Sequence, residues 1–295
     1  MWLIFAILTV IFWGVSETIF KKSSKTDKNS VAHLLAYNGI FYGITGVIYM
    51  LIVYKGFNFN PINLLKYLPI ASVYILSMFS YYHAMSRVKI SIISPIVNSS
   101  CLITVILSVF ILKQYPNLTQ LFAIILIIFS IIMLSINKKS EDDIEENKIG
   151  NKTSKWVYLM GIVFALGYFI LDGLASFLDE FTLEGFMNED DMLISYALIY
   201  LVVGIICFIY LKIKDKDYKF KMDKTKFAGS IVETAGQYMF VYALASGDAA
   251  IISPFVASYS VVTIILSRIF LKEKLKWNQY LFIVLILTGV VILSF

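Results

Sequence analysis

Acidic side chains inside otherwise apolar segments are the residues of this sequence best suited to do chemistry. Glu17 follows Trp13 by four residues, and Asp172 follows Tyr168 by the same spacing. Residues four apart share one face of a helix, so each pair places an aromatic ring beside a carboxylate. The spacing predicts two carboxylates that face a shared cavity and bind a cation or exchange protons. The alternative is that both acids lie near helix ends and reach lipid headgroups or water.

A third acid in an apolar segment, Glu233, precedes Gln237 by four residues. With Tyr238 and Tyr242 nearby, the spacing predicts a second polar stripe along a helix. A partly desolvated carboxylate at this place would suit proton coupling. An interfacial carboxylate within reach of Lys226 is equally compatible with the sequence.

Two prolines lie early in apolar segments and have similar surroundings. Pro95 and Pro254 lack an N–H, so each leaves a carbonyl one turn earlier without its helical partner. In a membrane that carbonyl needs another partner, such as a side chain, water or solute. Polar side chains cluster beside both prolines, and Asn98 and Tyr259 are the members that we expect to line a cavity. Close packing of helices through small hydroxyl residues is the alternative.

The elements that position these residues are predicted to be membrane helices. The chain of 295 residues is 59% hydrophobic and 15% charged, whereas a soluble domain carries about 25% charged residues. Apolar runs of about 20 residues are long enough to cross a bilayer as helices. The runs indicate ten spans: 2–20, 31–54, 67–86, 90–112, 117–137, 156–178, 192–211, 227–246, 249–271 and 277–295.

The sequence contains a duplication. Residues 91–135 match residues 250–294 without a gap, at 18 of 45 positions. The identities include Ser-Pro, Lys and Gln, which shared hydrophobicity alone does not explain. A charged stretch at 138–155 reads as a solvated linker between a first half, 1–137, and a second half, 156–295.

Because each half contains five spans, the second copy starts on the opposite side of the membrane from the first. Such inverted repeats are typical of secondary transporters, which bind their solute near the midplane where the halves meet. Of the 25 basic residues, 21 fall in the loops after odd-numbered spans. The positive-inside rule then places both termini outside the cytoplasm.

Several of these residues resemble a known family. The early proline, the Leu-Lys-Glu-Lys turn at 271–274, Gln279 and Gly289 resemble the repeat of EamA-type transporters of the drug/metabolite transporter superfamily. Phe12-Trp13-Gly14 looks like the Trp-Gly of the same family. Two departures are Gln114 and Ser130, which replace an expected Glu and Gly. A third departure is orientation, since many family members are thought to keep both termini in the cytoplasm.

The expected fold is therefore an all-α polytopic membrane protein with ten transmembrane helices in two inverted five-helix repeats. The expected function is secondary active transport of a small organic metabolite, preferably a cationic or zwitterionic amine or amino acid, by alternating access with possible proton coupling. A lipid-linked sugar flippase of the same superfamily and a non-transporting membrane sensor are the alternatives. A flippase would need basic residues for phosphate, where these spans offer acids.

The expected partners are the lipid bilayer of the plasma membrane, the solute and the proton. The sequence has no Gly-rich phosphate-binding loop and no His-Glu-x-x-His motif, so neither ATP-driven transport nor an enzyme is expected. No cofactor, metal site or nucleic-acid partner is expected, and an oligomer is compatible with the sequence without being required.

Overall fold

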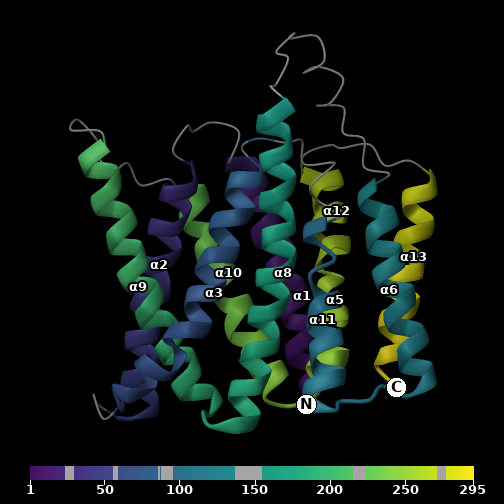
Figure 1. Cartoon of the computed structure of the whole chain (residues 1–295), viewed down its shortest axis with the longest axis horizontal. Helices are drawn as coiled ribbons and strands as arrows, with labels where there is room; N and C mark the ends of the chain where they lie inside the picture. The colour runs from purple at the N-terminus through teal and green to yellow at the C-terminus, as the bar shows by residue number, and fades with distance from the viewer. Residues whose placement is uncertain are drawn as a thin grey trace. The chain divides into compact units, whose positions relative to one another are not determined.

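The protein is all-helical, as the apolar runs predict. The computed structural model describes residues 1–23, 30–55, 59–85, 87, 96–136, 155–214, 224–270 and 277–295. These residues form ten helices (Figure 1), of which two change character or break along their length. They are α1 (Trp2–Ser23), α2 (Ser30–Val53), α3 (Ile62–Met85), α5 (Cys101–Leu107) with the π-helix η2 (Ser108–Leu112), α6 (Leu118–Ile136), α8 (Lys155–Gly185), α9 (Glu189–Lys214), α10 (Lys224–Leu244), α11 (Ala249–Ala257) with α12 (Tyr259–Phe270), and α13 (Trp277–Leu293).

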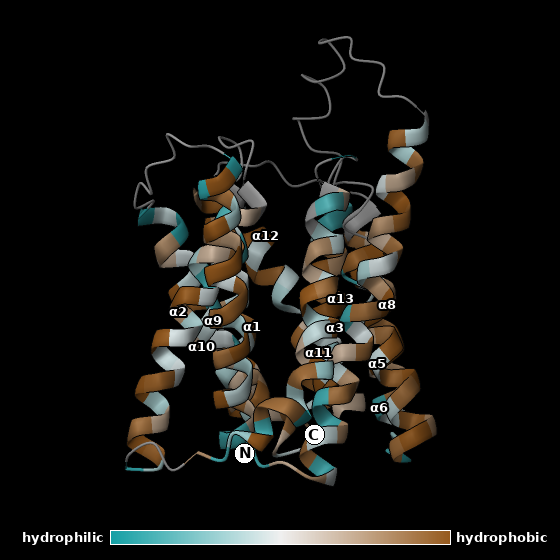
Figure 2. Cartoon of the chain, turned by 60° about the vertical axis from the view of Figure 1, so that its left-hand side comes forward, coloured by the Kyte–Doolittle hydropathy of each residue, from teal (hydrophilic) through white to brown (hydrophobic). Residues whose placement is uncertain are grey.

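Most of these helices have the length and composition of membrane spans. Six described segments qualify as spans, and three shorter helical segments are also apolar. Hydrophobic residues run along the bodies of the helices while hydrophilic residues gather toward their ends (Figure 2). The exception is α10, whose buried face carries Lys226, Ser230, Thr234 and Gln237. This polar stripe lowers the hydropathy of α10 and makes it the helix whose polar side chains need partners inside the protein.

Two helices extend well beyond the apolar run at one end. α3 begins at Ile62 and not near 67, and α8 continues to Gly185 and not to 178. The added part of α8 is rich in acids and contains no proline, so nothing in the backbone stops the helix at the end of the apolar run.

The helices form two compact units that do not coincide with the two sequence halves. Unit 1 contains residues 1–72 and 179–246, and unit 2 contains residues 73–178 and 247–295. Each unit therefore takes helices from both halves, and α3 and α8 contribute to both units.

In unit 1, α2 and α9 run antiparallel, side by side (Figure 1). A glycine in each helix lets the backbones touch: a Cβ added at Gly39 would lie 2.6 Å from the Gly204 Cα. The contact continues from Gly46 against Ala197, and Met50 and Ile194 share one buried cluster. Small residues at such a crossing permit the close packing that holds membrane helices together.

The second pair in unit 1 is α1 with α10, again antiparallel. Gly229 contacts Phe20, and Gly236 contacts Trp13. Farther along, the rings of Phe5 and Tyr242 stack at 5.4 Å. This register brings the middle of α1 against the polar stripe of α10.

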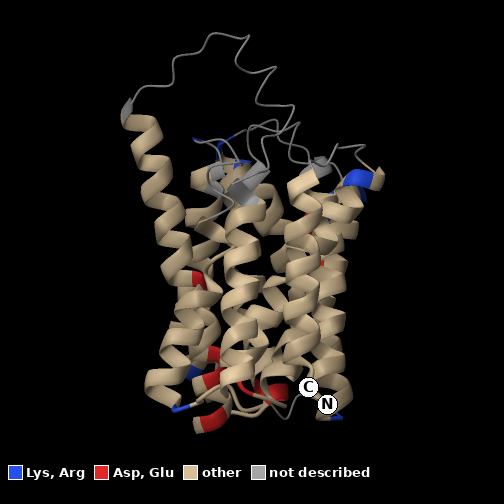
Figure 3. Cartoon of the chain, turned by 90° about the vertical axis from the view of Figure 1, so that its right-hand side faces the viewer, with Lys and Arg blue, Asp and Glu red and all other residues tan. Residues whose placement is uncertain are grey.

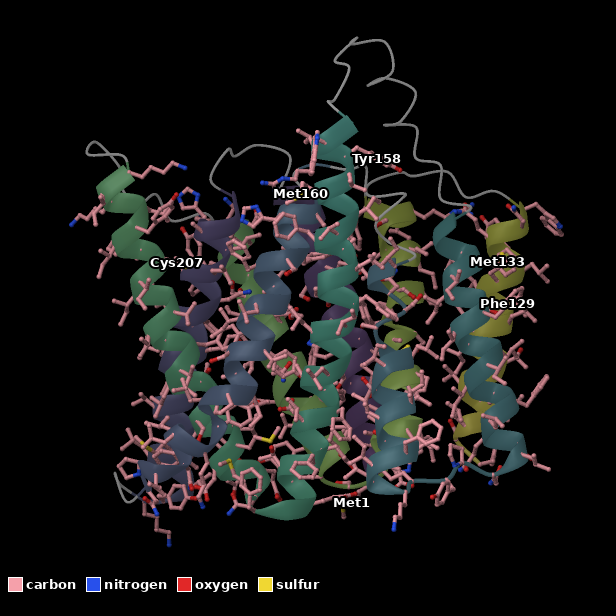
Figure 4. All side chains as sticks on the ribbon, viewed as in Figure 1. Met1, Phe129, Met133, Tyr158, Met160 and Cys207 are labelled. Atoms are coloured by element: carbon pink, nitrogen blue, oxygen red, sulfur yellow. The ribbon has the colours of Figure 1, made fainter. Side chains whose placement is uncertain are left out.

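In unit 2, α6 packs against α13, the equivalent helix of the other half. Gly289 meets Ile127 and Ala123, and the rings of Phe129 and Phe282 are 6.4 Å apart. Figure 4 shows Phe129 on α6, beside α13. The duplicated segments therefore pack on each other.

Both copies of the duplicated segment contain a helix interruption at the same place. Ser99 N–H bonds to Ile96 O at 3.3 Å, and the equivalent Ser258 N–H bonds to Phe255 O at 3.1 Å. These tight turns precede α5 and α12. Polar side chains at the interruptions lie where the backbone leaves the regular helical pattern.

Charge is distributed unevenly along α9. Its first turn holds Glu189, Asp190 and Asp191, and its last turn holds Lys212 and Lys214. Figure 3, in which Asp and Glu are red, shows acidic residues gathered toward one end of the helices.

Candidate functional site

In unit 1 the register of α1 on α10 places Glu233 beside two polar residues of α1. Ser16 Oγ donates a hydrogen bond to Glu233 Oε2 at 2.5 Å. Glu17 lies close enough to Glu233 for the two carboxylates to interact electrostatically. Both glutamates are half-buried. The structure thus brings together two predicted acids from different halves of the chain.

Aromatic and amide groups lie one turn away from this carboxylate pair. The Trp13 ring is 5.1 Å from the Phe240 ring, and Gly236 leaves room for the indole. Gln237, four residues after Glu233, is buried, and its Nε2 has no hydrogen-bond partner among the described residues. A buried amide donor without a protein partner is suited to bind a solute oxygen.

In unit 2, Asp172 has a hydroxyl environment of the same kind. Ser100 Oγ, just before α5, donates to Asp172 Oδ2 at 2.7 Å, and Tyr168 is hydrogen-bonded to the same carboxylate. Thr104 Oγ1 donates to the carbonyl of Gly173 at 2.9 Å, and a Cβ on that glycine would lie 2.3 Å from the Ser100 carbonyl oxygen. Close approach of the two helices through Gly173 is what lets Ser100 reach the acid.

Two aromatic residues lie near Tyr168, the predicted Tyr259 and Tyr81, which was not predicted. The Tyr168 ring lies 5.1 Å from Tyr81 of α3, and Tyr259 is within electrostatic range of the Tyr168 hydroxyl. Tyr259 is the first residue of α12, directly after the interruption at Ser258. Asn98 is half-buried in the equivalent turn before α5.

Of the two predicted cavity prolines, the structure describes Pro254. α11 runs through the buried Pro254 and is interrupted four residues later, at Ser258. The proline therefore lies inside the helix that precedes the interruption. The hydrogen bond that it removes is one turn earlier, at the Ala250 carbonyl, so the interruption at Ser258 lies on the other side of the proline. Pro95 lies outside the described residues.

The sequence analysis did not identify the tyrosine partners of the acids near the start of α9. Tyr49 is hydrogen-bonded to both Asp190 and Tyr242, and Tyr242 donates to Asp190 at 3.1 Å. Tyr54 donates to Asp191 at 2.5 Å. Burial and this hydrogen bond to Asp191 raise the pKa of Tyr54 to about 12, so its hydroxyl keeps its proton.

The end of α3 in unit 2 carries a different polar contact. Arg87 Nη1 lies 2.8 Å from His83 Nδ1, and the guanidinium carbon is 5.2 Å from the centre of the Phe164 ring. Burial and the neighbouring Arg87 charge lower the pKa of His83. We therefore interpret the neutral imidazole of His83, held by Arg87, as a structural group at the end of α3.

Metal-binding side chains do not gather in the part of the chain that the structure describes. Among residues 1–23, 30–55, 59–85, 87, 96–136, 155–214, 224–270 and 277–295, no group of three or more His, Cys, Asp or Glu side chains is arranged to hold a metal ion. The arrangement is one of carboxylates held by hydroxyl groups with aromatic rings nearby, inside apolar helices.

Comparison with known proteins decides what kind of protein carries this arrangement. The EamA-like transporter family matches residues 1–136 and again residues 156–295. The chain belongs to the EamA-like transporter family. This EamA protein is accordingly a multi-pass membrane transporter and not an enzyme, with two EamA repeats that cover nearly the whole chain.

Two individual proteins are similar to it. An uncharacterized protein of Methanocaldococcus jannaschii is 33% identical over 139 residues, which are 46% of this chain and 96% of that relative. The relative is thus only about half as long as this EamA protein. A solved crystal structure of a protein matches with a TM-score of 0.75 at 10% identity. The match covers 99% of this chain and 98% of the chain in that structure. That likeness shows the fold alone.

Proposed function

We propose that this EamA protein is a secondary active carrier that moves a small cationic or zwitterionic solute, amine- or amino-acid-like, by alternating access coupled to protons. The observation that carries the proposal recurs in each unit. A half-buried carboxylate accepts a hydrogen bond from a serine of a neighbouring segment and has aromatic rings nearby, as in Ser16–Glu233 and Ser100–Asp172.

Hydroxyl donors suit such a carboxylate to reversible binding. A serine or tyrosine hydroxyl holds the carboxylate in place without neutralising its charge, unlike lysine or arginine. The acid can then take up either a proton or an ammonium group. Trp13 and Tyr168 add aromatic faces that attract a cation, by about 0.5–2 kcal/mol for each favourable contact.

Competition for one carboxylate is the proposed source of coupling. In unit 1, Glu17 and Glu233 repel each other when both are charged, so the uptake of one proton or one cationic solute relieves that repulsion. If proton and solute exclude each other at this place, release of one permits binding of the other. Asp172 would provide the equivalent group in unit 2, with Asn98 and Tyr259 as neighbouring polar contacts and Gln237 as an amide donor in unit 1.

The cellular setting is part of the same proposal. We infer a plasma-membrane location with both termini outside the cytoplasm, from the excess of lysine and arginine in the loops after odd-numbered spans. The halves 1–137 and 156–295 are the two copies of the sequence duplication, joined by the charged linker at 138–155. The partners are the bilayer, the solute and the proton.

The test is transport by the purified protein in vesicles that carry a pH gradient, with a panel of amines and amino acids. The expected result is gradient-driven accumulation of at least one member, lost in E233Q, E17Q and D172N. D248N is the matched control because Asp248 is exposed. Retention of the wild-type rate and pH dependence by all three neutral variants would contradict the carboxylate mechanism.

A further inference from the structure

A row of buried tyrosines crosses the inside of unit 1. Tyr42, Tyr67, Tyr196 and Tyr200 come from α2, α3 and α9, and none is more than 4% exposed. The ring of Tyr196 lies 6.3 Å from Tyr67, 5.2 Å from Tyr42 and 4.5 Å from Tyr200. Buried tyrosine hydroxyls need hydrogen-bond partners, so a row of them forms a polar path through an apolar core.

One end of this row is a buried acid. Tyr67 Oη donates to Asp179 Oδ1 at 2.7 Å, and both side chains are 0% exposed. Asp179 is followed by the buried Glu180 and, one turn later, by the exposed Glu184. These residues belong to the stretch 179–191, which holds six acids and no base. The acids lead from the surface of unit 1 to the first tyrosine.

The other end of the row is the carboxylate that we assign to transport. Tyr42 Oη donates to the backbone carbonyl of Glu233 at 3.5 Å and is within electrostatic range of the Glu233 carboxylate. Tyr42 is hydrogen-bonded to Tyr196, and the Tyr200 ring lies 4.5 Å from the Tyr196 ring. The hydroxyls of Tyr196 and Tyr67 are within electrostatic range of each other.

We propose that Tyr67, Tyr196 and Tyr42 form a proton-conducting chain between Asp179 and Glu233, through which the coupling proton reaches the solute site. This inference rests on the proposed function. Once Asp179 has taken up a proton, the direction of its hydrogen bond with Tyr67 reverses. Each hydroxyl would then receive a proton from its neighbour on the Asp179 side and pass its own proton toward Glu233. One proton leaves Asp179, one arrives on Glu233, and every tyrosine ends neutral. Tyr200 lies beside the chain, with its ring packed against Tyr196.

The groups around the two ends suit this transfer. Glu233 is faced by Ser16 and Glu17 of α1 and by Tyr42 of α2. On its own helix, Tyr238 is within electrostatic range of Tyr42. Asp179 is faced by Tyr67 of α3. Carboxyl and hydroxyl groups can each accept and release a proton, so every step has a donor and an acceptor.

The experiment compares wild type with Y42F and Y196F in vesicles, because phenylalanine keeps the ring and removes only the hydroxyl. Both variants leave the Tyr67–Asp179 hydrogen bond intact. Two rates are measured: solute-driven proton movement, with a pH-sensitive dye inside the vesicles, and solute counterflow, which needs no net proton movement. We expect proton movement to slow on the order of 10²-fold while counterflow and thermal stability stay at wild-type values.

Y210F is the matched control, since Tyr210 lies on the same helix as Tyr196 and is 52% exposed. Proton movement at the wild-type rate in both chain variants overturns the proton path and leaves the proposed function intact. An equal loss of counterflow, proton movement and stability also overturns it, in favour of a packing role. Wild-type protein that carries solute without protons overturns both the chain and proton coupling.

Discussion

Ser16 and Glu233 are 217 positions apart in the sequence, yet Ser16 Oγ donates a hydrogen bond to Glu233 Oε2 at 2.5 Å. The contact fixes a carboxylate of α10 against α1, one turn from the place where Gly236 meets Trp13. Because the donor is a hydroxyl, the acid is oriented without being neutralised. The pair therefore lies both at the contact between α1 and α10 and at the proposed site.

Removal of that hydroxyl is expected to weaken transport without abolishing it. A hydrogen bond to a charged group contributes about 1.5–3 kcal/mol, so S16A should lower solute uptake by roughly one to two orders of magnitude if the bond is needed for the productive position of Glu233. The measurement is initial uptake at a fixed pH gradient. T18V is the control, because among the described residues the Thr18 hydroxyl bonds to the Gly14 carbonyl of its own helix, at 2.8 Å. Equal uptake by S16A and T18V would remove Ser16 from the site.

The corresponding contact in unit 2 predicts a loss of solute affinity in S100A. Ser100 orients Asp172, so its loss should raise the solute concentration for half-maximal counterflow about tenfold. S77A is the matched variant, since Ser77 is buried and, within the described part of the chain, donates to the Tyr74 carbonyl of its own helix. An unchanged half-maximal concentration in S100A would show that Asp172 needs no orienting hydroxyl.

Sequence reasoning identified the local part of this site and missed its long-range part. Apolar runs predicted the helices, and a spacing of four residues predicted that Tyr168 and Asp172 share a face; the two side chains are hydrogen-bonded because such contacts form within one helix. The contacts of Glu233 with Ser16 and Tyr42 depend on which helices pack together and in what register. That register depends on close approaches between distant glycines, and one sequence without aligned relatives carries no signal for them.

The same limit applies to the organisation of the chain. The duplication identified two halves, but each compact unit takes helices from both. Tyr67 and Asp179 illustrate the consequence. Tyr67 begins an apolar run of the first half, Asp179 directly follows an apolar run of the second half, and only the packing of α3 with α8 in unit 1 makes them partners. The acid-rich stretch 179–191 was visible as a charge pattern, whereas its tyrosine partners were not.

Gly39 is expected to be essential for the packing of α2 on α9. A Cβ at this position would lie 2.3 Å from the Tyr200 carbonyl oxygen and 2.6 Å from the Gly204 Cα, and backbone atoms cannot move aside. G39A should therefore destabilise the protein by about 1–3 kcal/mol, as overpacked cores do. The measurement is thermal unfolding in detergent. G185A is the control because a Cβ there meets nothing within 4 Å. Equal melting temperatures for the two variants would contradict the close helix contact.

Gln114 is predicted to stabilise the start of α11. Its Oε1 accepts a hydrogen bond from the Ala250 N–H at 3.2 Å. This N–H is one of the backbone donors that a helix leaves unpaired in its first turn. Q114A should cost about 1 kcal/mol, as the loss of a cap does. Q114E keeps an acceptor oxygen and should unfold near the wild-type temperature. If Q114E is as unstable as Q114A, the stabilisation comes from the amide group and not from the cap.

The charge distribution along α9 predicts the orientation of the protein. Acids fill the first turn of this helix and Lys212 and Lys214 the last, so the positive-inside rule places the last turn in the cytoplasm. In a background with C101A and C207A, which removes both free cysteines, N188C should react with an impermeant maleimide added outside intact cells. K214C should react only after the membrane is opened. The reverse labelling pattern would place both termini in the cytoplasm, and reaction of both cysteines from outside would mean that α9 does not cross the bilayer.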